Sequence, residues 1–323
     1  MNPVVIVLLI VLGVLVLFFL IASFLLWRIA CSRNDATEKH FETVLSSPFY
    51  RDFKDQILAA RDWLEAQNTE EVCVTSYDGL RLAATYLPCE NARGTLLLFH
   101  GWRGGPVADF GYSLKLYYSL GLNILLVHQR AQGKSEGKHM TFGVRERKDV
   151  HTWVSWHTER FGKDVPMLLG GISMGASTVL MACGEPFDGD VRGVFADCGF
   201  TGPKEIFAAV ARRIHLPAPL FVPAVGLWTR LFAGFRATEY STLDAMKTMA
   251  LPVLFAHGEA DRLVPCEMTK RNYAACASAD KTLLLVPGAK HGQSFPTAPE
   301  RYTKEIRGLI ERALGSVNNE ERK

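Results

Sequence analysis

The chain begins with a long apolar run, from Pro3 to Trp27, that contains no charged side chain. As a helix this run would be about 37 Å long at ~1.5 Å per residue, and the hydrocarbon core of a bilayer is ~30 Å thick. A cleaved signal peptide has a shorter apolar core behind a positively charged start, whereas only Met1 and Asn2 precede this run. The pattern therefore favours a transmembrane signal anchor over residues 3–27, rather than a signal peptide or a buried core helix.

Cationic residues follow the predicted anchor, and none precedes it. Arg28, Arg33 and Lys39 lie just after the apolar run, so the positive-inside rule places the rest of the chain in the cytoplasm. The stretch that ends at Cys31 resembles a lipoprotein cleavage box, but Arg28 stands where such a box has leucine. We therefore interpret the segment as an anchor that is retained.

Between residues 32 and 68 the apolar positions follow a helical spacing, which predicts a helical connector. Its apolar face is formed by Phe41, Val44, Leu45, Phe53, Ile57, Leu58 and Trp63. From Val72 the pattern changes to two strands, 72–76 and 80–87, joined by the turn Asp78-Gly79. This arrangement is typical of a β-hairpin.

Short apolar strands then alternate with helical stretches. The predicted strands cover residues 95–99, 123–127, 166–170, 191–196, 252–256 and 282–286, and predicted helices cover residues 108–120, 145–160 and 300–314, with another from Ala176. This alternation predicts a mostly parallel sheet covered by helices on both faces. Residues 202–249 interrupt it with three short apolar helices, which we interpret as a small cap within one α/β domain over residues 69–317.

Composition narrows the classes of function. The formal net charge of +3 is too small to indicate a nucleic-acid partner, and no basic run interleaved with aromatic residues occurs. The seven cysteines are scattered and odd in number, so we predict neither a disulfide framework nor a structural zinc site, and the pattern suits a reducing compartment. The scattered histidines do not form a metal-ligand set, and we expect no metal or organic cofactor.

One predicted strand, over residues 166–170, runs into Gly171-Ile172-Ser173-Met174-Gly175 and then into a helix. Glycines on both sides of a serine allow a sharp turn that lifts the hydroxyl away from the backbone, and the N-terminus of the following helix favours negative charge. Ligands of open parallel sheets bind at the carboxyl ends of the strands. The pattern therefore predicts Ser173 as a nucleophile, with an ordinary turn as the alternative.

A serine nucleophile needs a base, and the base needs an acid that orients it. His291 follows the last predicted strand in a glycine-flanked loop and is the best placed of the nine histidines. Asp261 lies in the loop after the preceding strand and is the predicted acid. Glu259, two positions earlier, and Asp197, directly after another strand, are the alternatives.

These motifs occur in an order that resembles the alpha/beta hydrolases, over the chain from about Val72 to Leu314. The motifs are Phe99-His100-Gly101-Trp102, Gly171-Ile172-Ser173-Met174-Gly175, His257-Gly258-Glu259-Ala260-Asp261 and Lys290-His291-Gly292. Within that superfamily the chain is most similar to the small-cap, often membrane-tethered group of esterase-like or serine-aminopeptidase-like hydrolases. The resemblance implies an alpha/beta-hydrolase fold and a Ser173–Asp261–His291 triad. It also implies an oxyanion hole from the backbone N–H groups of Trp102 and Met174.

The sequence departs from this family after the strand over residues 123–127. Relatives carry Asp at the position of His128 and His at the position of Gln132. These positions support the floor of the site and do not perform the chemistry. The triad is unaffected, but a relative's substrate cannot be carried over directly.

The triad and the Phe- and Leu-rich cap beside an anchor predict an enzyme that cleaves carboxylic esters with an apolar acyl group. The substrate would be a small-molecule or lipid-like ester. One alternative is an aminopeptidase-like enzyme, in which Glu205 or Glu239 of the cap would bind the amino terminus. A second alternative is an inactive, membrane-tethered binding scaffold. The oligomeric state is not predicted.

Overall fold

Eight strands form one twisted sheet in the computed structural model, which describes residues 1–33 and 38–315. The strand order is β1-β2-β4-β3-β5-β6-β7-β8. Their bounds are β1 Glu70–Thr75, β2 Arg81–Leu87, β3 Thr95–Phe99, β4 Asn123–His128, β5 Met167–Ile172, β6 Val191–Asp197, β7 Val253–Gly258 and β8 Lys281–Val286. Strand β2 pairs antiparallel with β1 and β4, and the remaining pairs are parallel. The predicted hairpin and mostly parallel sheet are confirmed.

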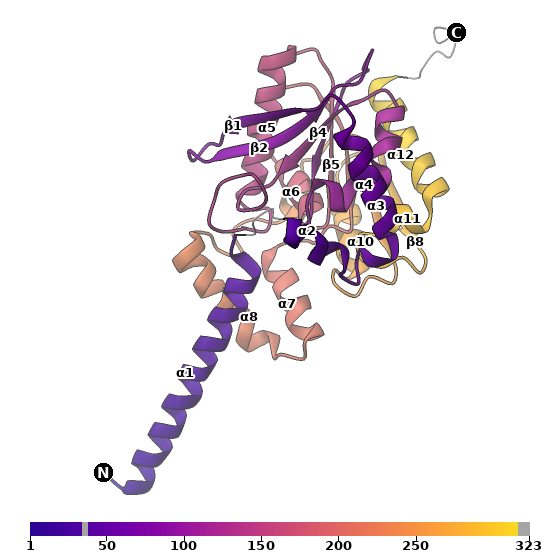
Figure 1. Ribbon diagram of the computed structural model, residues 1–323. Coiled ribbons are helices and arrows are strands. Elements are labelled where there is room, and N and C mark those ends of the chain that lie inside the picture. Colours follow the sequence, from indigo (N-terminus) through magenta and orange to yellow (C-terminus); the bar gives the residue numbers. More distant parts are fainter. Residues whose placement is uncertain (34–37, 316–323) are drawn as a thin grey trace.

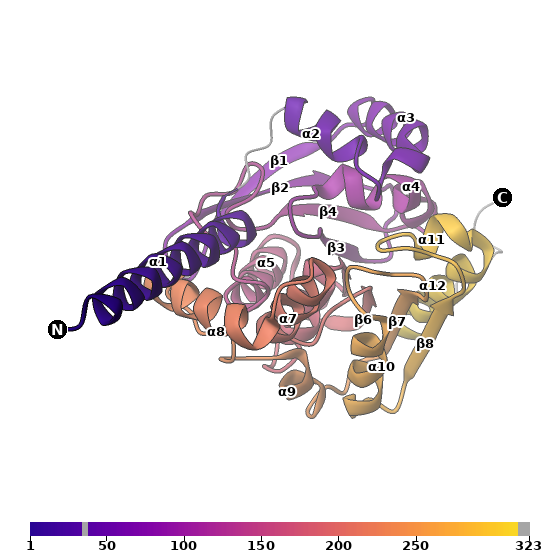
Figure 2. The ribbon, with the colours of Figure 1, turned by 90° about the horizontal axis from the view of Figure 1, so that it is seen from below.

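Helices cover both faces of this sheet (Figure 2). One face packs on α3 (Lys54–Glu65), α4 (Pro106–Ser119) and α12 (Pro299–Leu314), and the other on α5 (Glu146–Phe161), α6 (Met174–Ala182) and α9 (Thr242–Met246). Alternate residues of one strand serve the two cores, because side chains along a strand point to opposite faces. Leu96 and Leu98 of β3 lie in one core, whereas Leu97 and Phe99 lie in the other. This two-sided burial explains the continuous apolar runs of the central strands.

The insertion after β6 forms a cap of helices on the same side of the domain as the N-terminus (Figure 1). It contains α7 (Pro203–Arg213) and α8 (Ala218–Trp228), and α8 continues into a π-helical turn, Thr229–Ala233. The third predicted cap helix, α9, is not part of the overhanging cap. Its residues Ala245 and Met246 are buried in the core between the sheet and helices α5 and α6. The overhanging part of the insertion is therefore the pair α7 and α8.

The connector packs as part of the domain. It consists of α2 (Glu38–Leu45), a short 3-10 turn at Arg51–Phe53, and α3. The two helices of the domain not yet named, α10 (Cys266–Ala275) and α11 (Ser294–Thr297), follow β7 and β8. Helix α3 lies against α4, where Ile57 and Ala60 are buried next to Gly111. Residues 34–37 of the predicted connector and residues 316–317 of the predicted domain lie outside the described residues.

Helix α1 (Pro3–Cys31) projects from the domain beside the cap (Figure 1). Within the described residues it is the one helix long and apolar enough to cross a membrane. The helix continues four residues beyond Trp27, the predicted end of the anchor. This last turn enters the domain, where Trp27 and Cys31 are buried.

A buried ion-pair network fixes the loop that follows β4. The guanidinium of Arg130 donates to both carboxylate oxygens of Asp149 at 2.6 Å and to those of Asp78 at 2.9 and 3.1 Å. The side chains of Arg130 and Asp149 are only 3% and 6% exposed. Breaking such a pair leaves one uncompensated buried charge.

We therefore expect Arg130→Met to lower the stability of the full chain by about 3–5 kcal/mol, seen as a fall of more than about 6 °C in the melting temperature in detergent. Lys163→Met is the matched control, because Lys163 pairs with Asp188 in an exposed ion pair at 3.6 Å, and such pairs contribute at most about 1 kcal/mol. Equal melting temperatures for the two variants would contradict the proposed importance of the buried network.

Candidate active site

The turn from β5 into α6 holds Ser173 in a strained backbone conformation. Its φ and ψ are 56° and −115°, a region that costs a non-glycine residue of order 1–3 kcal/mol. The flanking glycines are needed because a side chain at Gly171 would collide with the backbone of Gly175, and one at Gly175 with the carbonyl of Phe99. The turn therefore requires the sequence pattern that predicted it.

His291 lies between Ser173 and Asp261. Its Nε2 is 2.8 Å from Ser173 Oγ, and its Nδ1 is 2.6 Å from Asp261 Oδ2. The three residues come from the loops after β5, β7 and β8, whose carboxyl ends meet at one edge of the sheet. A hydroxyl, an imidazole and a carboxylate in this order can pass a proton from the serine to the histidine.

The carboxylate of Asp261 is saturated with hydrogen bonds. Oδ1 accepts from the backbone N–H groups of Leu263 and Val264 at 2.7 and 3.0 Å, and Oδ2 contacts His257 Nε2 at 3.1 Å in addition to His291. Burial opposes ionisation of this group, but the two histidines outweigh burial, so the pKa of Asp261 is lowered. Asp261 is therefore ionised at neutral pH.

The pKa of His291 is raised above its usual value. Burial by itself favours the neutral imidazole, but the charge of Asp261 and its hydrogen bond favour the imidazolium more strongly. The imidazole is thus a stronger base than a free histidine. This property suits a group that must accept the proton of a serine hydroxyl.

The carboxylates of the two alternative acids make other contacts. Asp197 is buried and accepts a hydrogen bond from Ser294 Oγ at 2.7 Å, and burial raises its pKa. Glu259 is exposed. Of the three candidates, Asp261 is the one hydrogen-bonded to His291.

The loop after β3 lies directly against Ser173. A β-carbon at Gly101 would be 3.2 Å from Ser173 Cβ. The loop is held from below, since the N–H of Gly101 donates to the buried carboxylate of Asp109 and the N–H of Arg103 donates to Gln132 Oε1 at 2.7 Å. Trp102 therefore occupies the position from which its N–H could face a substrate carbonyl, and the oxyanion-hole assignment to Trp102 and Met174 stays a prediction.

Comparison with known proteins shows which hydrolases this chain is similar to. A family model described as Hydrolase_4, Serine aminopeptidase, S33, matches residues 222–295. The chain is 26% identical to the uncharacterized protein YqkD of Bacillus subtilis, over 76% of this chain and 80% of that protein. It is 23% identical to the monoglyceride lipase of Saccharomyces cerevisiae, over 68% and 86% of the two chains. The Pyrococcus furiosus esterase Pf2001 matches with a TM-score of 0.64 and 22% identity, over 77% of this chain and 93% of that chain.

The chain has the alpha/beta-hydrolase fold. This conclusion rests on the sheet order, the helix layers and the similarity of fold, and it confirms the resemblance inferred from the motifs.

The two departures from the family pattern lie under the β3 loop of the hydrolase. Gln132 is buried, and its Oε1 accepts from the backbone N–H of Arg103 at 2.7 Å, so its amide supports this loop. Burial lowers the pKa of His128 to about 4 and that of its neighbour His100 to about 3. Both imidazoles are therefore neutral at physiological pH.

The connector supplies contacts to the site that the sequence pattern did not reveal. Tyr50 donates its hydroxyl hydrogen bond to Asp109, and the ring of Phe49 packs edge-on against His291 at 5.8 Å between centroids. The carbonyl of Phe49 also accepts from Gln293 Nε2 at 2.8 Å. The one signal in the sequence is the pair of aromatic residues, Phe49 and Tyr50, within the predicted helical connector.

An apolar cavity of about 370 Å³ extends from Ser173 under the cap. Its described lining contains no charged residue. It is formed by Leu26, Ile29, Ala30, Trp102, Phe142, Ser173, Phe200, Ile206, Phe207, Val210, Ala211, Ile214, Leu216, Phe221, Val222, Val225, Leu263 and Val264. Helices α1, α7 and α8 thus provide most of the wall, which can accept an apolar group next to the serine hydroxyl.

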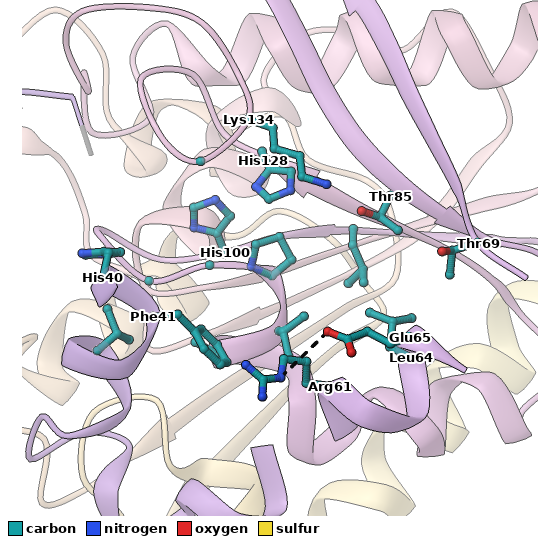
Figure 3. Close-up of a pocket in the computed structure, with 18 of the residues that line it drawn as sticks. His40, Phe41, Arg61, Leu64, Glu65, Thr69, Thr85, His100, His128 and Lys134 are labelled. Carbon is teal, nitrogen blue, oxygen red and sulfur yellow. Dashed lines mark ion pairs between the residues drawn. The ribbon is translucent and has the colours of Figure 1, made fainter. Parts of the chain in front are cut away.

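A second cavity, of about 360 Å³, lies between the connector and the loops after β3 and β4 (Figure 3). His128 and Lys134 line one side, and Arg61 and Glu65 of α3 form an ion pair at 3.9 Å on the other. Ser173 does not line it. The chemistry assigned to Ser173 therefore belongs to the apolar cavity.

Three ligand-type atoms lie close together near Ser173, on Cys198, Asp261 and His291. The proximity of Asp261 and His291 is explained by their hydrogen bond. Burial raises the pKa of the Cys198 thiol well above its usual value, and a protonated thiol is a poor metal ligand. We therefore do not interpret this cluster as a metal site.

Replacement of the acids should separate the three candidates. We expect Asp261→Asn to slow labelling of Ser173 by a fluorophosphonate by about 10⁴-fold, because His291 loses the group that fixes its tautomer. Asp197→Asn and Glu259→Gln serve as controls and should change the rate by less than about tenfold, as neither contacts His291. A large loss in Asp197→Asn with little loss in Asp261→Asn would reverse the assignment.

Proposed function

We propose that this hydrolase cleaves carboxylic esters with an apolar acyl group, using Ser173 as its nucleophile. One observation carries the proposal: Ser173 Oγ is hydrogen-bonded to His291 at 2.8 Å and lines an apolar cavity. The first feature supports nucleophilic attack on a carbonyl carbon, and the second supports an apolar group next to that carbonyl. The esterase and lipase among the similar proteins are consistent with this activity.

The reaction would proceed in two halves. Ser173 Oγ attacks the carbonyl carbon while His291 Nε2 takes the hydroxyl proton, and His291 then protonates the departing alcohol. Water next attacks the acyl-enzyme, with His291 again acting as base, and the acid leaves. The N–H groups of Trp102 and Met174 would stabilise the oxyanion by about 3 kcal/mol each, and Asp261 would stabilise the imidazolium.

An aminopeptidase-like activity is less well supported. Such an enzyme needs an acidic group that receives the amino terminus of the substrate. Glu205 is instead paired with Arg271 at 3.1 Å and hydrogen-bonded to Thr201, and Glu239 accepts from the backbone of Arg236. Neither glutamate lines the cavity of Ser173.

An inactive scaffold is also less well supported. A binding protein would have no use for a serine in a strained conformation with a histidine in hydrogen-bond range. The strain at Ser173 and the saturated Asp261 carboxylate would both be costs without a benefit.

We further propose that α1 anchors the hydrolase in a membrane with its catalytic domain in the cytoplasm. The helix is long and apolar enough to span a bilayer, and Arg28, Arg33 and Lys39 follow its apolar part. A signal sequence would also satisfy the length test. Detection of the intact N-terminus on membrane-bound protein would distinguish the two.

Substitution of the nucleophile tests the proposed function. We expect Ser173→Ala to lower the hydrolysis of p-nitrophenyl butyrate by the full chain in detergent by at least about 10³-fold, since no acyl-enzyme can form. The full chain is required because α1 lines the cavity. Ser119→Ala, at the exposed end of α4, should leave the rate unchanged. Equal rates in the two variants would mean that Ser173 is not the nucleophile.

The pH dependence tests the role of the histidine. The pKa of His291 is raised, so its protonated, inactive form persists to higher pH than for a free histidine. As the pH is lowered, kcat/KM should therefore fall with an apparent pKa above about 6.5. Asp261→Asn removes the charge that raises this pKa, so the acid limb should move to lower pH. The phosphonylation rate of Ser173 measures both profiles. An acid limb that stays in place would exclude the His291–Asp261 coupling.

A further inference from the structure

The last turn of α1 is joined to the loop that faces Ser173. Trp102 Nε1 donates to the carbonyl of Ala30 at 2.7 Å, and Arg103 donates from two nitrogens to the carbonyl of Ile29 at 3.2 and 3.0 Å. Arg103 also reaches the carbonyl of Ser32 at 3.1 Å. Carbonyls at a helix C-terminus have no hydrogen-bond donors within the helix. Here the predicted oxyanion-hole loop supplies the donors.

Helix α1 also forms part of the cavity wall. Leu26, Ile29 and Ala30 line the same apolar cavity as Ser173. Ile29 is 61% exposed although it lines the cavity, so the cavity reaches the surface beside this helix. The side of α1 determines whether a residue meets the cavity, because Leu25 is exposed and does not line it.

Helix α8 of the cap runs alongside α1 (Figures 1 and 2). Aromatic pairs join the two at successive levels: Phe19 with Phe221 at 5.0 Å, Phe24 with Trp228 at 5.5 Å, and Trp27 with Phe232 at 5.1 Å between centroids. Trp228 Nε1 also donates to Ser23 Oγ at 3.0 Å. The start of α8 therefore lies farthest from the domain, level with Phe19.

These levels place the cap at the edge of a bilayer. A hydrocarbon core of ~30 Å takes about 20 helical residues at ~1.5 Å each. A hydrocarbon core that begins at Pro3 ends near Ala22. Phe19 is three residues before Ala22, so its partner Phe221 lies about 5 Å inside the core. Interfacial helices are immersed to about 5–10 Å.

The outer surface of the cap suits this position. Its exposed apolar residues, each 48% to 60% exposed, are Ile214, Leu220, Leu227, Leu231 and Phe232. Between residues 206 and 235 the sequence contains no Asp or Glu, whereas Arg212, Arg213 and Arg230 are exposed there. Arginine side chains at this depth can reach lipid phosphates while their stems stay in apolar surroundings.

We propose that α1 is a substrate-binding wall and that the cavity opens between α1 and the cap into the bilayer. This rests on the proposed ester hydrolysis at Ser173. The substrate class is then an ester lipid resident in the bilayer. Its acyl chain enters between α1 and α8 at the level of Phe221, which also lines the cavity, and it presents the ester carbonyl to Ser173.

The test uses the full chain in dioleoylphosphatidylcholine vesicles and two substrates, membrane-embedded p-nitrophenyl palmitate and water-soluble p-nitrophenyl acetate. Leu26→Trp narrows the cavity from the α1 side and should lower the ratio of palmitate to acetate turnover at least about tenfold. Leu25→Trp adds the same bulk on the bilayer side of α1 and should leave that ratio unchanged. An unchanged ratio in Leu26→Trp, or the same fall in both variants, would overturn the proposal.

A second variant tests the immersion of the cap. Leu220→Glu places a charge at the deep end of α8 and should lower palmitate turnover in vesicles at least about tenfold, whereas acetate turnover changes less than about twofold. Lys163→Glu, on the exposed surface of the domain, is the control. If Leu220→Glu leaves palmitate turnover unchanged, the proposal is overturned. It is also overturned if the unsubstituted chain is a dimer and Leu220→Glu is a monomer, because the apolar patch would then bind a second copy of this chain.

The two ways of failing are distinguishable. If the unsubstituted chain hydrolyses neither ester, or if Ser173→Ala hydrolyses both at the normal rate, the proposed function fails. If acetate turnover depends on Ser173 but the palmitate ratio does not depend on Leu26, the hydrolase assignment holds and the route through the bilayer is wrong.

Discussion

The strained turn at Ser173 is the constraint on which the rest of the site depends. A serine with a φ of 56° is stable only where its surroundings over-determine it. Its N–H donates to the carbonyl of Asp197 at 2.8 Å, and α6 packs so closely on β3 that Gly175 touches the carbonyl of Phe99. The central strands therefore hold Ser173 rigidly, and the surrounding loops supply the other parts of the site.

One of these parts is the loop after β3, which three separate regions hold in place. Asp109 at the start of α4 binds Gly101, Gln132 after β4 binds Arg103, and the end of α1 receives Trp102 and Arg103. Helix α1 thus carries the proposed membrane anchor and also holds the loop that faces Ser173. The same turn that leaves the predicted membrane segment also positions the backbone that would receive the oxyanion.

The sequence was sufficient to predict the sheet and the hydrogen-bonded trio, because the signals for both are local. Apolar runs mark the strands, and Ser173, Asp261 and His291 each follow one strand directly. The contribution of α1 could not be predicted in this way, since Ala30 and Trp102 are 72 positions apart and no local pattern links them. The pattern that predicts the helical connector likewise does not reveal its contacts with the site, where Tyr50 reaches Asp109 and Phe49 packs on His291.

The saturation of Asp261 explains how a charged group can operate beside an apolar cavity. A carboxylate has about four acceptor positions, and Asp261 uses them for His291, His257 and two backbone N–H groups. A buried charge without such partners would neutralise instead. Because the carboxylate cannot turn without breaking one of these bonds, the ring of His291 is held with Nε2 toward Ser173. The apolar wall then excludes water and strengthens this interaction, so the cavity that would select the acyl group also promotes the chemistry at its end.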